Sequence, residues 1–280
     1  MKVTYIDHMG SDLSVVNAAR VSFGKTSEFV WYNASKDKEV PMTPEFAGIA
    51  ELSGYHKKLS KVDQSLVRFL ARGCTSGDWD GLLLDLAENG FDHVRLGDGD
   101  NKVHIEYLEE TANHIRKMPS HWTPFAHTAI SLHLKMPIFV ARQIMKTVAG
   151  MVYNEVSRRY VDTPPEFFVP EWRSRADNVK QGSGGPLNDP DLDDVEAFYG
   201  DVTLLYQEML ERGVAPEQAR MILPQSMYTE VIATGNLYSW ANLYNQRTDS
   251  HAQKETQDLA HQIGSIIAPK FPVSWEALTS

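Results

Sequence analysis

Residues 154 to 160 combine an amide, a carboxylate, a hydroxyl and two guanidinium groups. In an extended segment alternate side chains share a face, which places Glu155, Ser157 and Arg159 together. The opposite face then holds Asn154, Val156 and Arg158. An acceptor, a small donor and a fork-shaped cation on one face suit a phosphate that carries a polar ring. A solvated strand edge, charged to prevent aggregation, has the same composition, so the segment alone leaves both interpretations open.

Local charge favours an anionic ligand near this segment. Residues 135 to 180 hold eight basic and five acidic side chains, a net charge of +3, whereas the whole chain carries −10. The overall negative charge argues against nonspecific binding to nucleic acid or to anionic membranes. The sequence therefore predicts a small anionic partner, with no nucleic acid and no membrane.

Length and composition are ordinary for a folded protein. The 280 residues can bury a substantial core, as one large domain or two small ones. No apolar run approaches the roughly 20 residues that span a bilayer, and the first residues lack the apolar core of a secretory signal. We therefore expect a cytoplasmic protein.

Cys74 is the single cysteine of the chain. One cysteine excludes an intrachain disulfide and a multi-cysteine metal site. No histidine neighbours Cys74 in the sequence, which favours a structural thiol over a nucleophile. A cysteine-dependent transferase nevertheless stays open as an alternative. The histidines 121, 127 and 133 match no metal motif, so we expect no metal site.

The elements that must position these residues follow from hydrophobic periodicity. Strict alternation over residues 129 to 135 predicts a half-buried antiparallel strand. A helix is expected from Pro137 to about Thr147. Further strands are predicted at 2–8, 155–160 and 227–233, and further helices at 12–20, around 66–70, 82–86, 103–116, 194–212, 216–223, 237–246 and 252–267. Residues 24 to 61 are predicted to be irregular, and residues 174 to 192 are predicted to form a loop. This order predicts an α+β fold without repeated βαβ units.

Several separated segments together resemble the flavin-dependent thymidylate synthases. The segments are 18–22 (AARVS), 121–127 (HWTPFAH), 141–143 (ARQ), 154–160 (NEVSRRY), 219–224 (ARMILP) and 245–255 (NQRTDSHAQKE). They occur in the order that the family shows and extend over well more than half of the chain. The resemblance implies a single domain over residues 1–280 with a mixed, mainly antiparallel sheet packed with helices, in which residues 25–117 form an N-terminal insertion.

The activity that the resemblance implies is methylation of dUMP at C5 to dTMP. Methylenetetrahydrofolate would supply the carbon, with FAD as cofactor and NADPH as reductant, and no enzyme cysteine would take part. Because sites in the family are assembled from several subunits, the resemblance also implies a homotetramer.

Site residues follow from the same resemblance. The positions that match the family's dUMP contacts are Gln143, Lys146, Glu155, Ser157, Arg159, Arg220 and Arg247, with Arg247 as the catalytic residue. The positions that match FAD contacts are Ser22, His121, Thr123, Asn154, Asn236, Asn242 and His251. Taken singly, the histidines could be structural, and Asn236 could be a turn residue.

The chain departs from the family on the flavin and folate side. Lys146-Thr147-Val148 stands where the family has Arg-His-Arg, Ala126 replaces a common glutamate, and Tyr238 replaces a cation. Lysine can meet a phosphate as a point charge but cannot make the bidentate contact of arginine. Gly150 suggests a looser turn. Besides the thymidylate synthase, this pattern fits a dUMP C5-hydroxymethylating enzyme or a nucleotide-binding homologue without redox activity.

Overall fold

The computed structural model describes residues 1–74, 120–176, 182–187 and 194–280. The chain divides into two compact units, Met1–His8 with Ile130–Ile266 and Met9–Ala129 with Ile267–Ser280, called here the sheet unit and the helical unit. The helices expected at 82–86 and 103–116 lie outside the described residues, as does much of the loop expected at 174–192. The single domain with an insertion at 25–117 stays a prediction.

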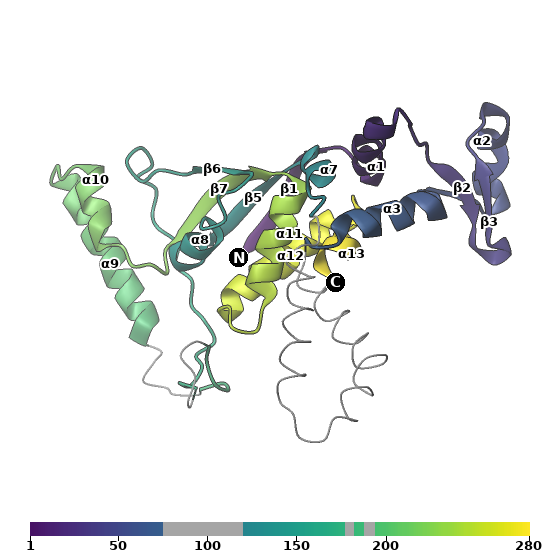
Figure 1. Ribbon diagram of the computed structural model, residues 1–280. Helices are drawn as coiled ribbons and strands as arrows, with labels where there is room; N and C mark the ends of the chain where they lie inside the picture. Colours follow the sequence, from purple (N-terminus) through teal and green to yellow (C-terminus); the bar gives the residue numbers. More distant parts are fainter. Residues whose placement is uncertain (75–119, 177–181, 188–193) are drawn as a thin grey trace, which may run out of the picture. The chain divides into compact units, whose positions relative to one another are not determined.

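A four-stranded sheet forms the centre of the sheet unit (Figure 1). Its strands follow the order β1 (Lys2–Met9), β5 (Ala129–Pro137), β7 (Tyr228–Gly235) and β6 (Met151–Glu155). Strand β7 runs antiparallel to both β5 and β6. Three of the four predicted strands are thereby confirmed, as is the α+β class with an antiparallel sheet.

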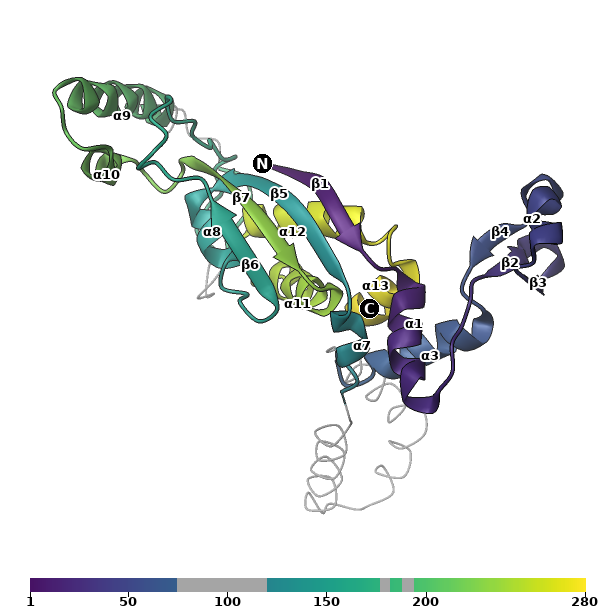
Figure 2. The ribbon, with the colours of Figure 1, turned by 90° about the horizontal axis from the view of Figure 1, so that it is seen from above.

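Three helices cover one face of this sheet, α8 (Ile138–Ile144), α11 (Leu237–Thr248) and α12 (Lys254–Ile267) (Figure 2). The alternation expected in β5 holds, because Ile130, Leu132 and Leu134 are fully buried. Each such side chain contributes roughly 1.5–3 kcal/mol through burial. The indole of Trp240 on α11 donates to the Ile130 carbonyl at 3.1 Å, which fixes the helix against the strand.

The long segment between β6 and β7 contains α9 (Asp194–Glu211), α10 (Pro216–Ala219) and the 3-10 helix η5 (Arg220–Ile222). The prediction of a helix at 194–212 is confirmed. The expected helix at 216–223 is instead a short α-helix that tightens into the 3-10 turn. Phe167 forms an isolated antiparallel bridge with Met227, which returns the segment to the sheet.

The helical unit contains α1 (Asp12–Arg20), α3 (Lys61–Ala71), α7 (Thr123–Ala126) and α13 (Pro272–Thr279), together with the 3-10 turn η1 (Val21–Phe23). Arg20 joins α1 to α3 through two hydrogen bonds to Asp63 Oδ1, at 3.0 and 2.6 Å. Ser11 rather than Asp12 is the N-cap of α1. The Asp12 carboxylate instead accepts the main-chain N–H groups of Val273 and Ser274 at the start of α13, both at 2.9 Å.

The prediction that residues 24 to 61 are irregular is wrong. They form a small antiparallel sheet of order β3 (Lys38–Pro41), β2 (Val30–Asn33), β4 (His56–Lys58). The 3-10 turn η2 (Ala34–Lys36) connects β2 to β3, and α2 (Pro44–Ala50) with the 3-10 turn η3 (Glu51–Ser53) connects β3 to β4. Trp31, Ala50 and Tyr55 build its core. Its strands are three or four residues long, too short for alternation to stand out in the sequence.

Two boundaries near the polar segment also differ from expectation. Helix α8 ends at Ile144, three residues before Thr147, and Pro137 is its N-cap. The strand expected at 155–160 is wrong, because β6 ends at Glu155 and residues 158–160 form a turn. No helix among the described residues is both long and apolar enough to cross a membrane.

Candidate functional site

The first cavity lies where β6 ends, and we call it the strand-end cavity. Its volume is about 420 Å³. Polar side chains from the predicted set line it, namely Glu155, Ser157, Arg159 and Arg220, together with Arg158 and Thr229. Four of the seven residues predicted to contact dUMP therefore share one cavity.

The end of β6 and the turn after it place these groups. Glu155 is the last strand residue, and its Oε1 accepts the hydroxyl of Thr229 on neighbouring β7 at 2.7 Å. After the strand, the main-chain N–H of Tyr160 donates to the Ser157 carbonyl at 3.0 Å, which closes the turn. The Ser157 Oγ accepts the N–H of Arg159 at 3.3 Å. The turn thus brings hydroxyl and guanidinium groups together beside the strand.

Arg220 reaches the same cavity from a segment more than sixty residues away in sequence. It opens η5, directly after α10, and its Nε donates to the Glu217 carbonyl at 3.3 Å. This contact holds the side chain near the helix end. Arg220 shares this cavity with Arg159, although no local sequence pattern links the two.

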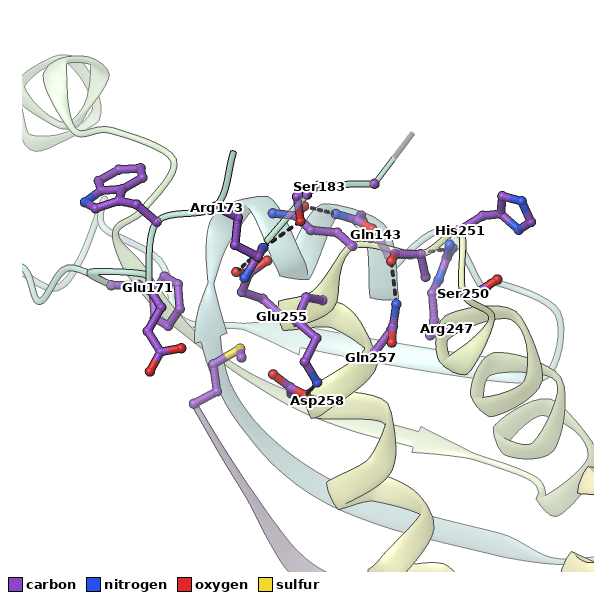
Figure 3. Close-up of a pocket in the computed structure, with 18 of the residues that line it drawn as sticks. Gln143, Glu171, Arg173, Ser183, Arg247, Ser250, His251, Glu255, Gln257 and Asp258 are labelled. Atoms are coloured by element: carbon purple, nitrogen blue, oxygen red, sulfur yellow. Dashed lines mark hydrogen bonds and ion pairs between the residues drawn. The ribbon is translucent and has the colours of Figure 1, made fainter. Parts of the chain in front are cut away.

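A second and larger cavity of about 1130 Å³ lies beside the start of α12, and we call it the helix-end cavity (Figure 3). Its lining includes three predicted residues, Gln143, Arg247 and His251, together with Arg173 and Glu255. The strand-end and helix-end cavities have no lining residue in common. The predicted dUMP set is therefore divided between two places in the sheet unit.

Arg247 is held at the carboxyl end of α8. Its Nη2 donates to the Gln143 carbonyl at 2.7 Å, and the Gln143 amide donates to Gln253 Oε1 at 2.8 Å. A helix carboxyl end carries partial negative charge, which favours a guanidinium there. The Arg247 Nε is buried and makes no hydrogen bond within the described chain. A buried unsatisfied donor of this kind suits an acceptor on a bound ligand.

An ion pair that the sequence did not predict crosses the helix-end cavity. Arg173 Nη2 donates to Glu255 Oε1 at 2.7 Å, and the two side chains are 25% and 6% exposed. Arg173 Nε also donates to Ser183 Oγ at 2.6 Å. Glu255 lies within the matched segment 245–255, but its partner is 82 residues away, so only the fold reveals the pair.

His251 lies at the rim of the helix-end cavity. Its Nδ1 is 2.8 Å from Asp249 Oδ1, and its side chain is 80% exposed. The imidazole points away from the other labelled residues (Figure 3). Hydrogen bonds from the main chain and the ring of His251 lower the pKa of Asp249. This position leaves the ring available to a ligand that extends beyond the cavity.

Lys146 is not brought into either cavity. It is exposed in the turn after α8 and lines neither the strand-end nor the helix-end cavity. Tyr153 on β6 fixes this turn, because its hydroxyl donates to the Thr147 carbonyl at 2.8 Å. Burial raises the pKa of Tyr153 to about 12, while the nearby charge of Arg247 opposes the rise.

The turn around Gly150 is tight, contrary to the looser turn expected from the sequence. Gly150 has a φ of 71°, a left-handed conformation that glycine adopts without strain. The Ser239 hydroxyl donates to the Ala149 carbonyl at 2.7 Å and would lie 2.3 Å from a Cβ at position 150. Any larger residue at 150 would therefore displace the start of α11.

The positions expected to contact flavin occur in both units. In the sheet unit, Asn236 is the N-cap of α11, with its Oδ1 accepting the Ser239 N–H at 2.9 Å. Asn154 is exposed on β6, and Asn242 is half-buried on α11. In the helical unit, Ser22 and Thr123 are exposed, and His121 stacks on Phe69 with centroids 5.6 Å apart.

These groups fit a flavin nucleotide chemically. Hydroxyl, amide and imidazole groups can bond a diphosphate and a ribityl chain without adding negative charge. In the sheet unit, the buried Nε of Arg247, which has no hydrogen-bond partner among the described residues, supplies a cationic donor. Asn236 keeps only its amide N–H₂ for a ligand, because its oxygen caps the helix.

The described residues contain no group of three or more His, Cys, Asp or Glu side chains placed to hold a metal ion. Cys74 Sγ lies 3.2 Å from Ser120 Oγ and 3.6 Å from the Leu70 carbonyl. Those contacts show a thiol among oxygen groups at the end of α3.

Comparison with known proteins identifies the family of the chain. The chain matches the model of the family described as thymidylate synthase complementing protein over residues 4–273. A flavin-dependent thymidylate synthase from Kosmotoga olearia is 38% identical over 182 residues, which is 63% of this chain and 75% of that protein. One from Thermosipho africanus is 40% identical over 162 residues, 56% of this chain and 71% of that protein.

Among solved structures, the UMP/dUMP methylase PolB from Streptomyces cacaoi, bound with 5-Br dUMP, has a TM-score of 0.63. It is 24% identical, and the match covers 99% of this chain and 94% of PolB, which supports the fold. The family match covers nearly the whole chain and confirms the resemblance. The chain belongs to the thymidylate synthase complementing protein family, that is, the flavin-dependent thymidylate synthases.

Proposed function

We propose that the protein methylates dUMP at C5 to form dTMP, as a flavin-dependent thymidylate synthase. Methylenetetrahydrofolate is the carbon donor and NADPH the reductant. One observation carries the proposal, which is the convergence of Glu155, Ser157, Arg159 and Arg220 on one cavity in a chain of this family. The names of the relatives from Kosmotoga olearia and Thermosipho africanus support the activity.

In this proposal the strand-end cavity binds the nucleotide through its phosphate. Arg159 and Arg220 can both make charge-assisted hydrogen bonds to phosphate oxygens, and the Ser157 hydroxyl can add a donor. Glu155 keeps one carboxylate oxygen for a donor on the nucleotide, because Thr229 occupies the other. Ser157 Oγ accepts N–H groups of Arg159, which suits binding rather than nucleophilic attack.

The helix-end cavity contributes the groups that act on the uracil ring. Arg247 can bond a uracil carbonyl oxygen and stabilise the negative charge that develops when C5 becomes nucleophilic. Gln143 presents its side-chain amide in the same cavity. Since the polar groups for phosphate and ring line separate cavities, we place the complete site between copies of the chain in a homotetramer.

FAD, when bound, supplies the hydride chemistry that reduces the transferred carbon. The residues that would hold it are Ser22, His121, Thr123, Asn154, Asn236, Asn242 and His251. Lys146 lines neither cavity of its own chain, so in this proposal it would meet the phosphate of a nucleotide held by a neighbouring copy, as a point charge. The role of each is to bind and orient, so that the reacting carbon lies over C5.

Spectroscopy of the flavin tests this function directly. Protein purified with FAD is expected to be yellow, dUMP is expected to perturb the flavin spectrum, and NADPH is expected to be oxidised in the complete reaction. Arg159→Ala should abolish the dUMP effect while FAD remains bound, whereas Arg212→Ala, at an exposed position directly after α9, should change neither. Protein that takes up no FAD and does not turn over dUMP would contradict the proposal.

A further inference from the structure

Arg158 lines the strand-end cavity, although neither the family resemblance nor strand alternation predicts it there. In an extended strand Arg158 would point away from Glu155, Ser157 and Arg159. The chain leaves β6 after Glu155, however, and residues 158–160 form a turn. The turn cancels the alternation and brings both neighbouring arginines to one cavity.

The charge of the cavity changes with this third guanidinium group. Arg158, Arg159 and Arg220 line it, and Glu155 is the one acidic residue in its lining within the part of the chain that the structure describes. Three cations and one anion leave a net charge of +2. A phosphate monoester carries about −1.5 to −2 at pH 7, so the net charge of the residues that line the cavity matches a monoester with Arg158 and falls to +1 without it.

Arg158 is anchored in a way that leaves most of its donors available. Its Nη1 donates to the Thr163 carbonyl, which ties the side chain across the turn. Arg159 and Arg220 each donate through Nε to a protein oxygen as well. A guanidinium has five N–H donors, so one anchoring bond leaves enough for an anion. Anchoring also lowers the entropy that each side chain loses when it binds a ligand.

We propose that Arg158 is a third phosphate-binding residue, which gives the protein its preference for nucleoside 5′-phosphates over nucleosides. This inference rests on the proposed function, because it takes the strand-end cavity as the phosphate site. In this proposal Arg158, in the turn after β6, is a phosphate-binding cation in addition to Lys146, which is exposed in the turn after α8.

Calorimetry on the full-length, FAD-loaded protein tests the role of Arg158 with dUMP, deoxyuridine and inorganic phosphate as ligands. Arg158→Gln keeps a polar amide donor but removes the charge. It should weaken dUMP binding about tenfold and leave deoxyuridine binding unchanged, since a hydrogen bond between charged groups is worth about 1.5–3 kcal/mol. The salt dependence of dUMP binding should fall, and Arg158→Lys should recover part of the affinity.

The matched control is Arg212→Gln, because the Arg212 side chain is 73% exposed and its one ion pair among the described residues is with Glu208, one turn away at 2.5 Å. It should bind all three ligands as the wild type does. The proposal is overturned if Arg158→Gln binds dUMP within twofold of wild type, or if dUMP and deoxyuridine weaken together, which indicates a structural role.

Failure of the proposed function gives a different result. Wild-type protein that does not bind dUMP would refute that function but would still report on Arg158 through inorganic phosphate. If Arg158→Gln binds inorganic phosphate more weakly than wild type and Arg212→Gln do, the assignment of Arg158 is supported. Equal phosphate binding by wild type, Arg158→Gln and Arg212→Gln rejects it.

Discussion

The strand-end and helix-end cavities use similar residues in opposite ways. The strand-end cavity is lined by three arginines and one glutamate, and each arginine donates a hydrogen bond to a nearby oxygen of its own segment. In the helix-end cavity, polar groups pair across long sequence separations, as Arg173 does with Glu255 and Arg247 with the Gln143 carbonyl. The strand-end cavity has excess positive charge for an anion, whereas the arginines of the helix-end cavity are paired with partners inside the protein.

This difference indicates a division of labour. Excess charge on a turn supplies affinity for a phosphate, while a guanidinium fixed at a helix end is preorganised to stabilise charge during reaction. Variants in the strand-end cavity should therefore change binding, and variants in the helix-end cavity should change turnover or folding. The following predictions test that comparison, from the largest expected effect to the smallest.

Replacing Arg247 should have the largest effect. Arg247→Ala removes the proposed charge stabilisation at the uracil ring, and removal of such a donor typically lowers kcat by about 10²–10³-fold. Steady-state kinetics should show this loss, with the Kd for dUMP measured by calorimetry changing much less. A Kd that rises as much as kcat falls would place Arg247 with the binding residues and remove the distinction between the cavities.

Breaking the buried ion pair should affect stability more than chemistry. Arg173→Met leaves Glu255 buried without its partner, which should cost about 3 kcal/mol of unfolding free energy. Denaturant titration measures this cost, with Arg175→Met at an exposed neighbouring position as the control. A second substitution, Glu255→Gln, in the Arg173→Met variant should restore part of the unfolding free energy, because it removes the unpaired buried charge. Unchanged stability of Arg173→Met would show that the pair does not hold the cavity together.

A change in the strand-end cavity should act on affinity. Arg220→Gln removes one phosphate contact, and we expect about a 30-fold weaker Kd for dUMP from the loss of a charge-assisted hydrogen bond. The kcat at saturating dUMP should remain within about threefold of wild type, because uniform binding is lost. If kcat fell while Kd stayed constant, the assignment of this cavity to phosphate binding would be wrong.

The smallest effect is expected at the turn that Tyr153 fixes. Tyr153→Phe loses one hydrogen bond to the Thr147 carbonyl, worth about 1 kcal/mol of unfolding free energy. Tyr206→Phe is the matched control, because the buried Tyr206 hydroxyl has no hydrogen-bond partner among the described residues. Equal stability of the two variants would contradict the role given to Tyr153.

The raised pKa of Tyr153 adds a pH signature to the same variant. Its pKa is raised from 10.0 to about 12, so the stabilisation is complete below pH 10 and is lost as the pH rises toward 12. Unfolding measured across that range should show a smaller alkaline decline for Tyr153→Phe than for wild type.

Much of the sheet unit could be predicted from the sequence, because its elements are long and periodic. The alternation of Ile130, Leu132 and Leu134 identified β5, and the helices α9, α11 and α12 followed from their spacing. The strand end at Glu155 could not be predicted, since a polar segment gives no hydrophobic signal for where pairing stops. That single boundary decided whether Arg158 faced the cavity.

The predicted site residues lie in separate groups rather than in one site. Matched motifs identified Glu155, Ser157, Arg159 and Arg220, which share a cavity, and Gln143 with Arg247, which share another. Arg173 and Thr229 were missed because their partners lie 82 and 74 residues away in sequence. Contacts of that separation depend on the fold, and no local pattern encodes them.

Mass analysis of the nucleotide product tests the central claim most directly. Wild-type protein is incubated with dUMP, methylenetetrahydrofolate, FAD and NADPH, and the mass of the nucleotide product is then measured by mass spectrometry. We predict dTMP, heavier than dUMP by one CH₂ group and dependent on NADPH. Unchanged dUMP would contradict the methylase and leave a nucleotide-binding homologue, and a product that carries an additional oxygen would identify a hydroxymethylating enzyme instead.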